Sequence, residues 1–368
     1  MCSFVVLGMF TSSIGVMLPH IEAFYHLNDV QASACFLAGP TGYVIAAQFN
    51  HAIHHRYGRR GIAIIGPVAQ LVAAAGTAMH PPFLVLLACI TLAFAGAGFL
   101  DGSWCTWAAG QKSPSFVSGL LHGSFSIGAG CGPMLIELIL SHGQPWYTWY
   151  KVLLLILSCA FVSEATPKTC GPDVSESPAQ SHTTSRQVFA YKALWICACF
   201  LLIQVGTESA ISGWVVTYML RVRQSSQKMA SMCSSAFWTG MAVSRIVLGF
   251  VSDKFGVRKT TVIYICCALI SQTLFVAVQG QILSAMLIAL VGFFCGPLFP
   301  SAIIRLTQLL PPAMGVQAVS FVASIGQLGA ALLPFGLGAL SHLIGLGVFG
   351  VVIISEFAVC LALWMVFS

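Results

Sequence analysis

Charged residues are scarce in this chain of 368 residues. Lys, Arg, Asp and Glu make up only 7% of it, whereas 58% of the residues are apolar and the mean hydropathy is +0.90. Soluble domains carry about a quarter charged residues, so this composition excludes an ordinary soluble protein and predicts a membrane protein. A net charge of +6 would suggest a nucleic-acid ligand in a soluble protein. In a membrane protein it indicates basic loops at the cytoplasmic face, and we expect no nucleic acid.

The sequence also lacks the patterns of metal, disulfide and catalytic sites. Its 14 cysteines include no Cys-x-x-Cys pair and lie mostly in apolar runs, so we predict no disulfide, no metal and no cofactor. The histidines of "HAIHH" at 51–55 suggest a metal site as a minor alternative, but no matching thiol or carboxylate accompanies them. Because no Ser/His, paired-Asp or His-metal constellation has a usable spacing, we do not expect an enzyme.

Long uncharged apolar runs occupy most of the chain. A helix needs about 20 apolar residues to cross a hydrocarbon layer of about 30 Å, and the runs lack the alternation of a membrane barrel. Backbone groups in lipid must then be satisfied within helices, so we predict an all-α membrane protein. Twelve spans are expected, at 4–25, 30–52, 62–80, 83–107, 116–140, 146–165, 189–219, 229–251, 260–279, 281–309, 313–340 and 342–367.

The most polar stretch is "EATPKTCGPDVSESPAQSHTTSRQV" at 164–188, which is typical of a linker. It predicts an N-terminal six-helix bundle at 1–165, a cytoplasmic linker at 166–188 and a C-terminal six-helix bundle at 189–368. A shift of 198 residues, the distance from Gly58 to Gly256, aligns the two halves. Other pairs at this offset are Thr41-Gly42 with Thr239-Gly240, Gly8 with Gly206, Gly128 with Gly326, and His122 with Ser320. Two pseudo-repeat bundles are therefore expected, an arrangement typical of transporters.

The segment "GFVSDKFGVRK" at 249–259 concentrates charge in a chain that otherwise has little. Gly249 allows two helices to approach closely, Asp253 can pair with a cation or a helix N-terminus, and Gly256 turns the chain. The segment also has three basic residues, Lys254, Arg258 and Lys259. Their side chains can bind a neighbouring helix in one conformational state and release it in another.

This segment resembles the Gly-x-x-x-Asp-Arg/Lys-x-Gly-x-Arg-Lys signature of the major facilitator superfamily. The plainer interpretation of one such segment is a solvated basic loop, but the repeat and the number of spans favour the superfamily. The first-half copy has His51 and His55 where the signature has glycine and an acid. We expect the segment at 249–259 to form part of a gate that opens and closes the transport path. The same gate is expected to include Arg245, Arg56, Gly58 and Arg60.

A finer resemblance lies in the fourth span, "GAGFLDGSWCTW". It is similar to the Gly-x-Gly-x-x-Asp/Glu segment of the fucose permease-like branch, especially its fungal members of the bypass-of-stop-codon type. The resemblance implies that the carboxylate of this span, Asp101, carries a coupling proton. Two departures are Met9-Phe10-Thr11-Ser12 in place of an Asn-Asp pair, and Cys105 in place of the Asn of a Trp-Asn-x-Trp motif.

Ionisable groups inside spans are costly, so each is a functional candidate. Glu208 shares a helical face with Gln204 and Ser212, with Trp214 on the same span, which predicts a cavity lining and a second candidate for proton coupling. Further expected substrate contacts are Trp104, Thr11, His122 and Gln327. For Trp104, a role in packing is as well supported as one in substrate binding. For Glu137 and Glu356, packing is the preferred interpretation. Arg305 either attracts an anionic solute or extends its side chain to the membrane interface.

We therefore expect a secondary active transporter that moves a small organic solute by alternating access and couples to protons. It is expected to work as a monomer in the lipid bilayer of the plasma membrane, with both termini cytoplasmic. In that topology ten of the 16 Lys and Arg residues fall on the inside, although "RVRQSSQK" at 221–228 is basic on the outside. Uptake of a sugar-like solute and efflux of a specialised metabolite both stay open, as does a non-transporting receptor or scaffold.

Overall fold

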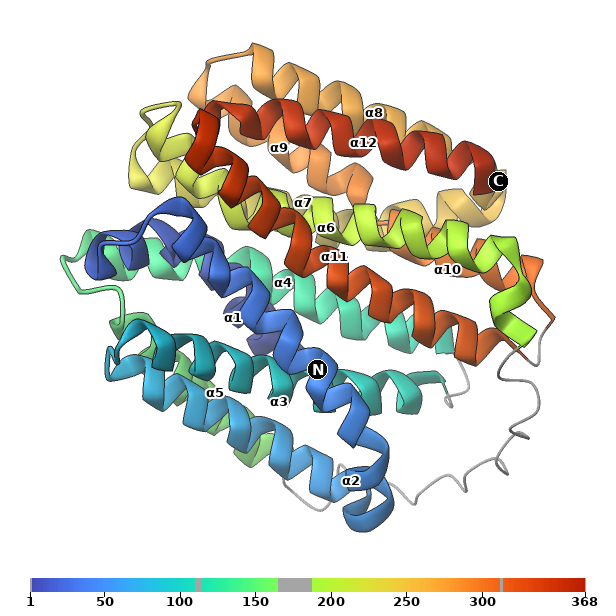
Figure 1. Ribbon diagram of the computed structural model, residues 1–368, viewed down its shortest axis with the longest axis horizontal. Coiled ribbons are helices and arrows are strands. Elements are labelled where there is room, and N and C mark those ends of the chain that lie inside the picture. Colours follow the sequence, from blue (N-terminus) through green and yellow to red (C-terminus); the bar gives the residue numbers. More distant parts are fainter. Residues whose placement is uncertain (1, 110–113, 165–186, 312–313, 368) are drawn as a thin grey trace. The chain divides into compact units, whose positions relative to one another are not determined.

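The computed structural model describes residues 2–109, 114–164, 187–311 and 314–367 (Figure 1). The chain divides into two compact units, Met1–Ser175 and Glu176–Ser368. Every regular element within the described ranges is a helix, so the all-α prediction is confirmed.

The first unit is built from long helices joined by short turns (Figure 1). They are α1 (Cys2–Tyr25), α2 (Asp29–Ala78), α3 (Phe83–Ala109), α4 (Pro114–Ser141) and α5 (Thr148–Glu164). Two expected spans lie within α2, and Gly58, with φ +64°, breaks the helix between them. Helix α1 packs along α4, while α2 packs along α3 and α5.

The described part of the second unit begins with a short 3-10 helix, η2 (Gln187–Ala190), where the start of a span was expected at 189. Its helices are α6 (Lys192–Arg221), α7 (Gln227–Phe255), α8 (Val257–Ala277), α9 (Gln281–Cys295), α10 (Leu298–Leu309), α11 (Gly315–Ile344) and α12 (Phe349–Phe367). The expected span at 281–309 is divided into α9 and α10, because Pro297 lacks the backbone N–H that a continuous helix needs.

Helix crossings within the two units follow the predicted repeat. A Cβ on Gly42 would lie 1.9 Å from the carbonyl oxygen of Thr91, and one on Gly240 would lie 2.1 Å from that of Ala289. Gly240 lies 198 residues after Gly42, and Ala289 lies 198 residues after Thr91. Helix α2 therefore crosses α3 in the same way as α7 crosses α9. Only glycine allows backbones to approach this closely.

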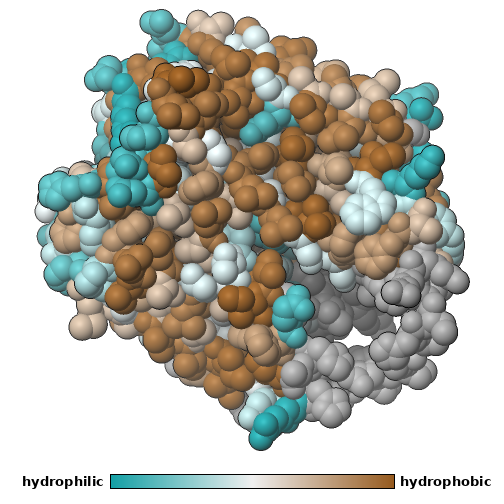
Figure 2. All heavy atoms as spheres, viewed as in Figure 1, coloured by the Kyte–Doolittle hydropathy of each residue, from teal (hydrophilic) through white to brown (hydrophobic). Residues whose placement is uncertain are grey.

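The surface suits a lipid environment. Ten helical segments of the described residues are long and apolar enough to cross a membrane, and α5 contributes a shorter apolar stretch, Thr148–Cys159. Large hydrophobic side chains such as Leu84 and Val366 are 78% and 72% exposed. Figure 2 shows hydrophobic residues over much of the visible face, with hydrophilic ones gathered at its margins.

Each unit has its own apolar core. In the second unit the core lies between α6, α8, α10, α11 and α12, where the rings of Phe200 and Trp364 lie 5.2 Å apart. In the first unit, Trp149 and Tyr150 of α5 are almost completely buried, and Tyr150 meets the ring of Phe10 on α1. These cores fix the helices that carry the polar residues described next.

Candidate functional site: buried polar pairs in each unit

In the first unit, Asp101 of α3 lies beside Tyr43 of α2. The Tyr43 hydroxyl donates a hydrogen bond to Oδ2 of Asp101, and both side chains are half-buried. Gly98, one turn before Asp101, makes this possible: a Cβ there would lie 2.9 Å from the carbonyl oxygen of Tyr43. The close crossing of α2 and α3 thus holds the phenol against the carboxyl group.

A second polar pair joins the same helices. Ser103, two residues after Asp101, donates from Oγ to Oδ1 of Asn50 at 3.5 Å. Asn50 lies two helical turns beyond Tyr43 on α2. The two pairs form a polar strip along the contact between α2 and α3, in spans that are otherwise apolar.

In the second unit, Glu208 of α6 is the centre of a polar group. Nε2 of Gln204, one turn earlier, donates to Oε2 of Glu208 at 3.3 Å. Nη2 of Arg245 on α7 lies 4.0 Å from Oε1 of Glu208, and the two side chains are 17% and 15% exposed. Arg245 was expected to belong to the gate near Asp253, so this ion pair gives it a partner that the sequence did not predict.

Gln204 adds a buried acceptor to this group. The residue is only 3% exposed, and its Oε1 has no hydrogen-bond partner within the described structure. An unsatisfied buried carbonyl costs about 1–3 kcal/mol. The group of Gln204, Glu208 and Arg245 can therefore accept a hydrogen bond from an additional donor.

Two other residues expected to line a cavity on α6 contact neighbouring helices. Trp214 is fully buried and donates from Nε1 to the carbonyl oxygen of Pro334 on α11 at 2.9 Å. Ser212 is 6% exposed and accepts a hydrogen bond from Nε1 of Trp238 on α7 at 3.0 Å. Both side chains hold α6 in place in this conformation.

Two of the substrate candidates of the first unit, Trp104 and His122, lie around Phe4 of α1. Trp104 packs against Phe4, whose ring also meets His122 edge-on at 6.2 Å. Thr11 donates its hydroxyl proton to the carbonyl of Leu7 in its own helix, at 2.9 Å. Gln327 is half-buried on α11 of the second unit.

The predicted gate segments form the expected turns. Gly256 has φ +88° and separates α7 from α8, at the position that Gly58 has in α2. The basic side chains described around these turns are exposed: Arg56, Lys254, Arg258 and Lys259. Gly249 lies within α7, and the side chains of Asp253 and Arg60 lie outside the described part of the structure.

No group of three or more His, Cys, Asp or Glu residues among the described positions is arranged to hold a metal ion. The histidine side chains of "HAIHH" and the side chain of Cys105 lie outside that part.

Comparison with known proteins decides the family. The sequence matches the Major Facilitator Superfamily over residues 1–227 and 207–368. The chain belongs to this superfamily. It is a multi-pass membrane protein of a transporter family and not an enzyme.

Individual relatives support this assignment. The chain is 27% identical to Bypass of stop codon protein 6 of Saccharomyces cerevisiae, over 93% of the chain and 76% of that protein. The predicted resemblance to fungal proteins of this type is therefore confirmed. Its fold is similar to that of the nucleoside transporter NupG, with a TM-score of 0.82 at 12% identity, covering 100% of this chain and 98% of that one. It is also similar to a D-xylose-proton symporter, with a TM-score of 0.77 at 13% identity and coverage of 98% and 95%.

The sequence analysis missed Tyr43 and the pairing of Arg245 with Glu208. A tyrosine in an apolar span has no distinctive spacing that would mark it as a partner of Asp101. For Arg245 no local signal exists, because its partner lies on another helix and depends on the register between α6 and α7.

Proposed function

We propose that this protein is a secondary active transporter that moves a small organic solute by alternating access and couples the movement to protons at Asp101. The observation that carries the proposal is the hydrogen bond between Tyr43 and Asp101 at the contact of two membrane-spanning helices. An acid in such a position is a functional candidate because its burial in lipid is costly.

The chemistry of the phenol suits a reversible proton carrier. A tyrosine hydroxyl can donate to a carboxylate and can also accept from a protonated carboxyl group. Asp101 can therefore gain or lose a proton while keeping its bond to Tyr43. This lowers the cost of changing the protonation state of Asp101 inside the bundle.

Glu208 suits this role less well. The guanidinium of Arg245 only donates hydrogen bonds and stays charged. Protonation of Glu208 would remove the negative charge that faces this partly buried cation, which is unfavourable away from water. We therefore assign the coupling proton to Asp101 and a solute-binding role to Glu208 and Gln204.

Uptake of a sugar-like solute is the first choice of transport reaction. The buried Oε1 of Gln204 suits a hydroxyl donor, and one solved structure of similar fold is named as a proton symporter of D-xylose. Efflux of a specialised metabolite is the second choice, because Gly128, Gly132 and Pro133 follow part of a glycine pattern associated with antiporters. In either case we place the protein in the plasma membrane as a monomer with both termini cytoplasmic.

Transport by the purified protein in proteoliposomes tests the proposal. With an inward proton gradient, wild-type protein should accumulate at least one solute from a panel of labelled sugars and polyols, and it should exchange that solute without a gradient. Gradient-driven loss of a preloaded solute would favour efflux. Solute binding without either movement would contradict transport and indicate a receptor.

A further inference from the structure

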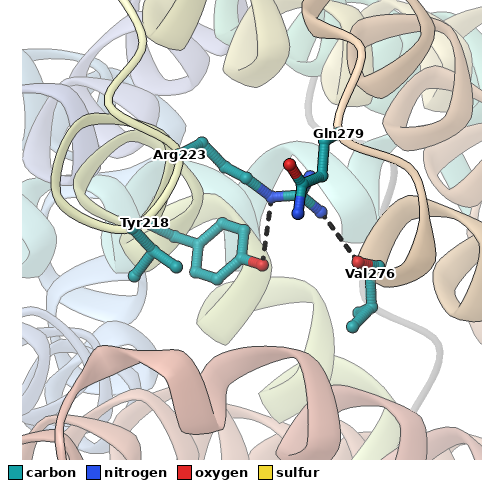
Figure 3. Close-up of a pocket in the computed structure, with 5 residues that line it drawn as sticks. Tyr218, Arg223, Val276 and Gln279 are labelled. Atoms are coloured by element: carbon teal, nitrogen blue, oxygen red, sulfur yellow. Dashed lines mark hydrogen bonds between the residues drawn. The ribbon is translucent and has the colours of Figure 1, made fainter.

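Arg223 connects the turn after α6 to the end of α8 (Figure 3). Its Nη2 donates to the carbonyl oxygens of Phe275 and of Val276, the latter at 3.0 Å, and its Nη1 donates to that of Val278. Helix α8 ends at Ala277, so these carbonyls belong to its last turn and to the residue that follows.

The last carbonyls of a helix have no partner within the helix, and they form the negative end of its dipole. A guanidinium provides several N–H donors in a fixed plane together with a positive charge. Arg223 therefore acts as a side-chain cap for α8, although it belongs to another helix connection.

The remaining faces of Arg223 are also engaged. Nε donates to the hydroxyl of Tyr218 at 3.3 Å, as Figure 3 shows. The guanidinium carbon lies 5.7 Å from the centre of the Tyr218 ring and 5.6 Å from that of Phe275. Both distances are in the range of cation–π attraction. The side chain is thus held by hydrogen bonds at its edge and by rings beside it.

The first unit has a corresponding contact. Tyr25 stands 198 residues before Arg223, at the end of α1, and its hydroxyl donates to the carbonyl oxygen of Pro81. Pro81 lies three residues after α2 ends at Ala78, in the loop before α3, whereas Val278 directly follows α8. A neutral phenol and a cationic guanidinium therefore reach the corresponding loop in the two units, and only the guanidinium also caps the last turn of the helix.

A third element joins each connection through aromatic rings. The ring of Tyr25 meets Trp146, just before α5, at 6.3 Å. The ring of Tyr218 meets Phe349, the first residue of α12, at 4.8 Å. Each unit thus has one junction between its first long helix, the loop that follows its third span, and the start of its last helix.

We propose that Arg223 and Tyr25 are paired latches that keep this end of each unit rigid. Conformational change within a unit then has to occur away from the junction, whatever solute is carried. The proposal also accounts for one of the three basic residues of "RVRQSSQK", which lies on the side where the sequence predicts few. The carbonyls of α8 offset the charge of Arg223, so this residue has a structural role that is separate from topology.

Hydrogen exchange and thermal unfolding of the purified full-length protein in detergent test the latches. Arg223→Ala should speed amide exchange in residues 277–285 and lower the unfolding midpoint by about 5 °C. Arg223→Lys should recover only part of this loss, because an ammonium lacks the planar set of donors. Tyr25→Phe should speed exchange in residues 78–86 instead, with a smaller shift of about 2 °C.

Lys228→Ala is the matched control, since Lys228 is an exposed basic residue at the start of α7 and no contact of its side chain is described. It should change neither the exchange nor the midpoint. The proposal is overturned if Arg223→Ala leaves exchange in residues 277–285 unchanged, or if exchange rises equally in both units. If Arg223→Ala does not fold, Arg223→Lys gives the same decision from the local exchange alone.

Discussion

The two units share their backbone crossings but not their polar chemistry. A Cβ on Gly98 would lie 2.9 Å from the carbonyl oxygen of Tyr43, and a Cβ on Gly296, 198 residues later, would lie 2.9 Å from that of Met241. The crossing is the same, yet only the first unit has a hydroxyl there that reaches an acid. The position of Asp101 is occupied by Phe299 in the second unit.

The reverse holds for the ion pair. Glu208 and Arg245 correspond to Phe10 and Ala47 in the first unit. Both units are therefore closely packed, because each crossing depends on a glycine, but the acid with a described polar partner lies at a different position in each unit. The difference indicates a division of tasks: one acid with a partner that tolerates protonation, and one acid in an ion pair.

The largest loss of stability is expected when a glycine at one of the shared helix crossings is replaced. Gly240→Ala should destabilise the protein by about 3 kcal/mol, because the new Cβ would meet the backbone of Ala289 at 2.1 Å. Gly42→Ala should cost a similar amount. Thermal unfolding in detergent measures both. Gly336→Ala is the control, since a Cβ there has no neighbour within 4 Å, and a loss limited to one of the first two variants would contradict equivalent packing.

The next effect concerns the ion pair. Arg245→Gln should cost about 2 kcal/mol of stability, because it leaves the Glu208 carboxylate without its cation. The double variant Glu208→Gln/Arg245→Gln should recover most of this loss. Thermal unfolding of both single variants and the double variant gives the coupling energy between Glu208 and Arg245. If the losses of the two single variants simply add up to the loss of the double variant, the ion pair contributes nothing to stability.

A smaller effect is expected at the phenol of the first unit. Tyr43→Phe removes the hydrogen bond to Asp101 but keeps the ring, so proton-driven accumulation should fall about tenfold, equivalent to about 1.4 kcal/mol. Solute exchange without a gradient should stay near the wild-type rate. Equal loss of both activities would place Tyr43 in packing or solute binding.

The smallest effect tests the two turns. Gly58→Ala and Gly256→Ala should each cost about 1 kcal/mol, because both residues have positive φ angles that a side chain disfavours. No atom would crowd the new Cβ, so the cost is purely conformational. Gly280→Ala is a suitable control because its φ is −67°. Unchanged melting temperatures would show that the turns relax without strain.

Much of this fold could be predicted from the sequence. Runs of apolar residues indicate spans directly, since the bilayer fixes their length, and Gly58 and Gly256 mark the breaks that the repeat places in corresponding positions. The split of the span at 281–309 was missed, although Pro297 was visible as a helix-breaking residue. The boundary near 189 differs because a 3-10 helix precedes α6, and the boundary near 342 differs because α11 continues to Ile344 and a 3-10 turn at 346–348 precedes α12.

The site was less accessible to sequence analysis. A single chain shows which side chains share a helical face, as for Gln204 and Glu208, because that depends on local geometry alone. It does not show the register between helices, which decides that Arg245 reaches Glu208 and that Tyr43 reaches Asp101. For the same reason, the contact of Trp214 with α11 could not be predicted from the sequence.

The central claim is that the acid of the first unit carries the proton and the acid of the second does not. Its most direct test compares Asp101→Asn with Glu208→Gln in the same proteoliposome assay, with and without a proton gradient. Asp101→Asn should abolish gradient-driven accumulation but retain solute exchange, whereas Glu208→Gln should reduce both activities together. Normal gradient-driven accumulation by Asp101→Asn would contradict the claim.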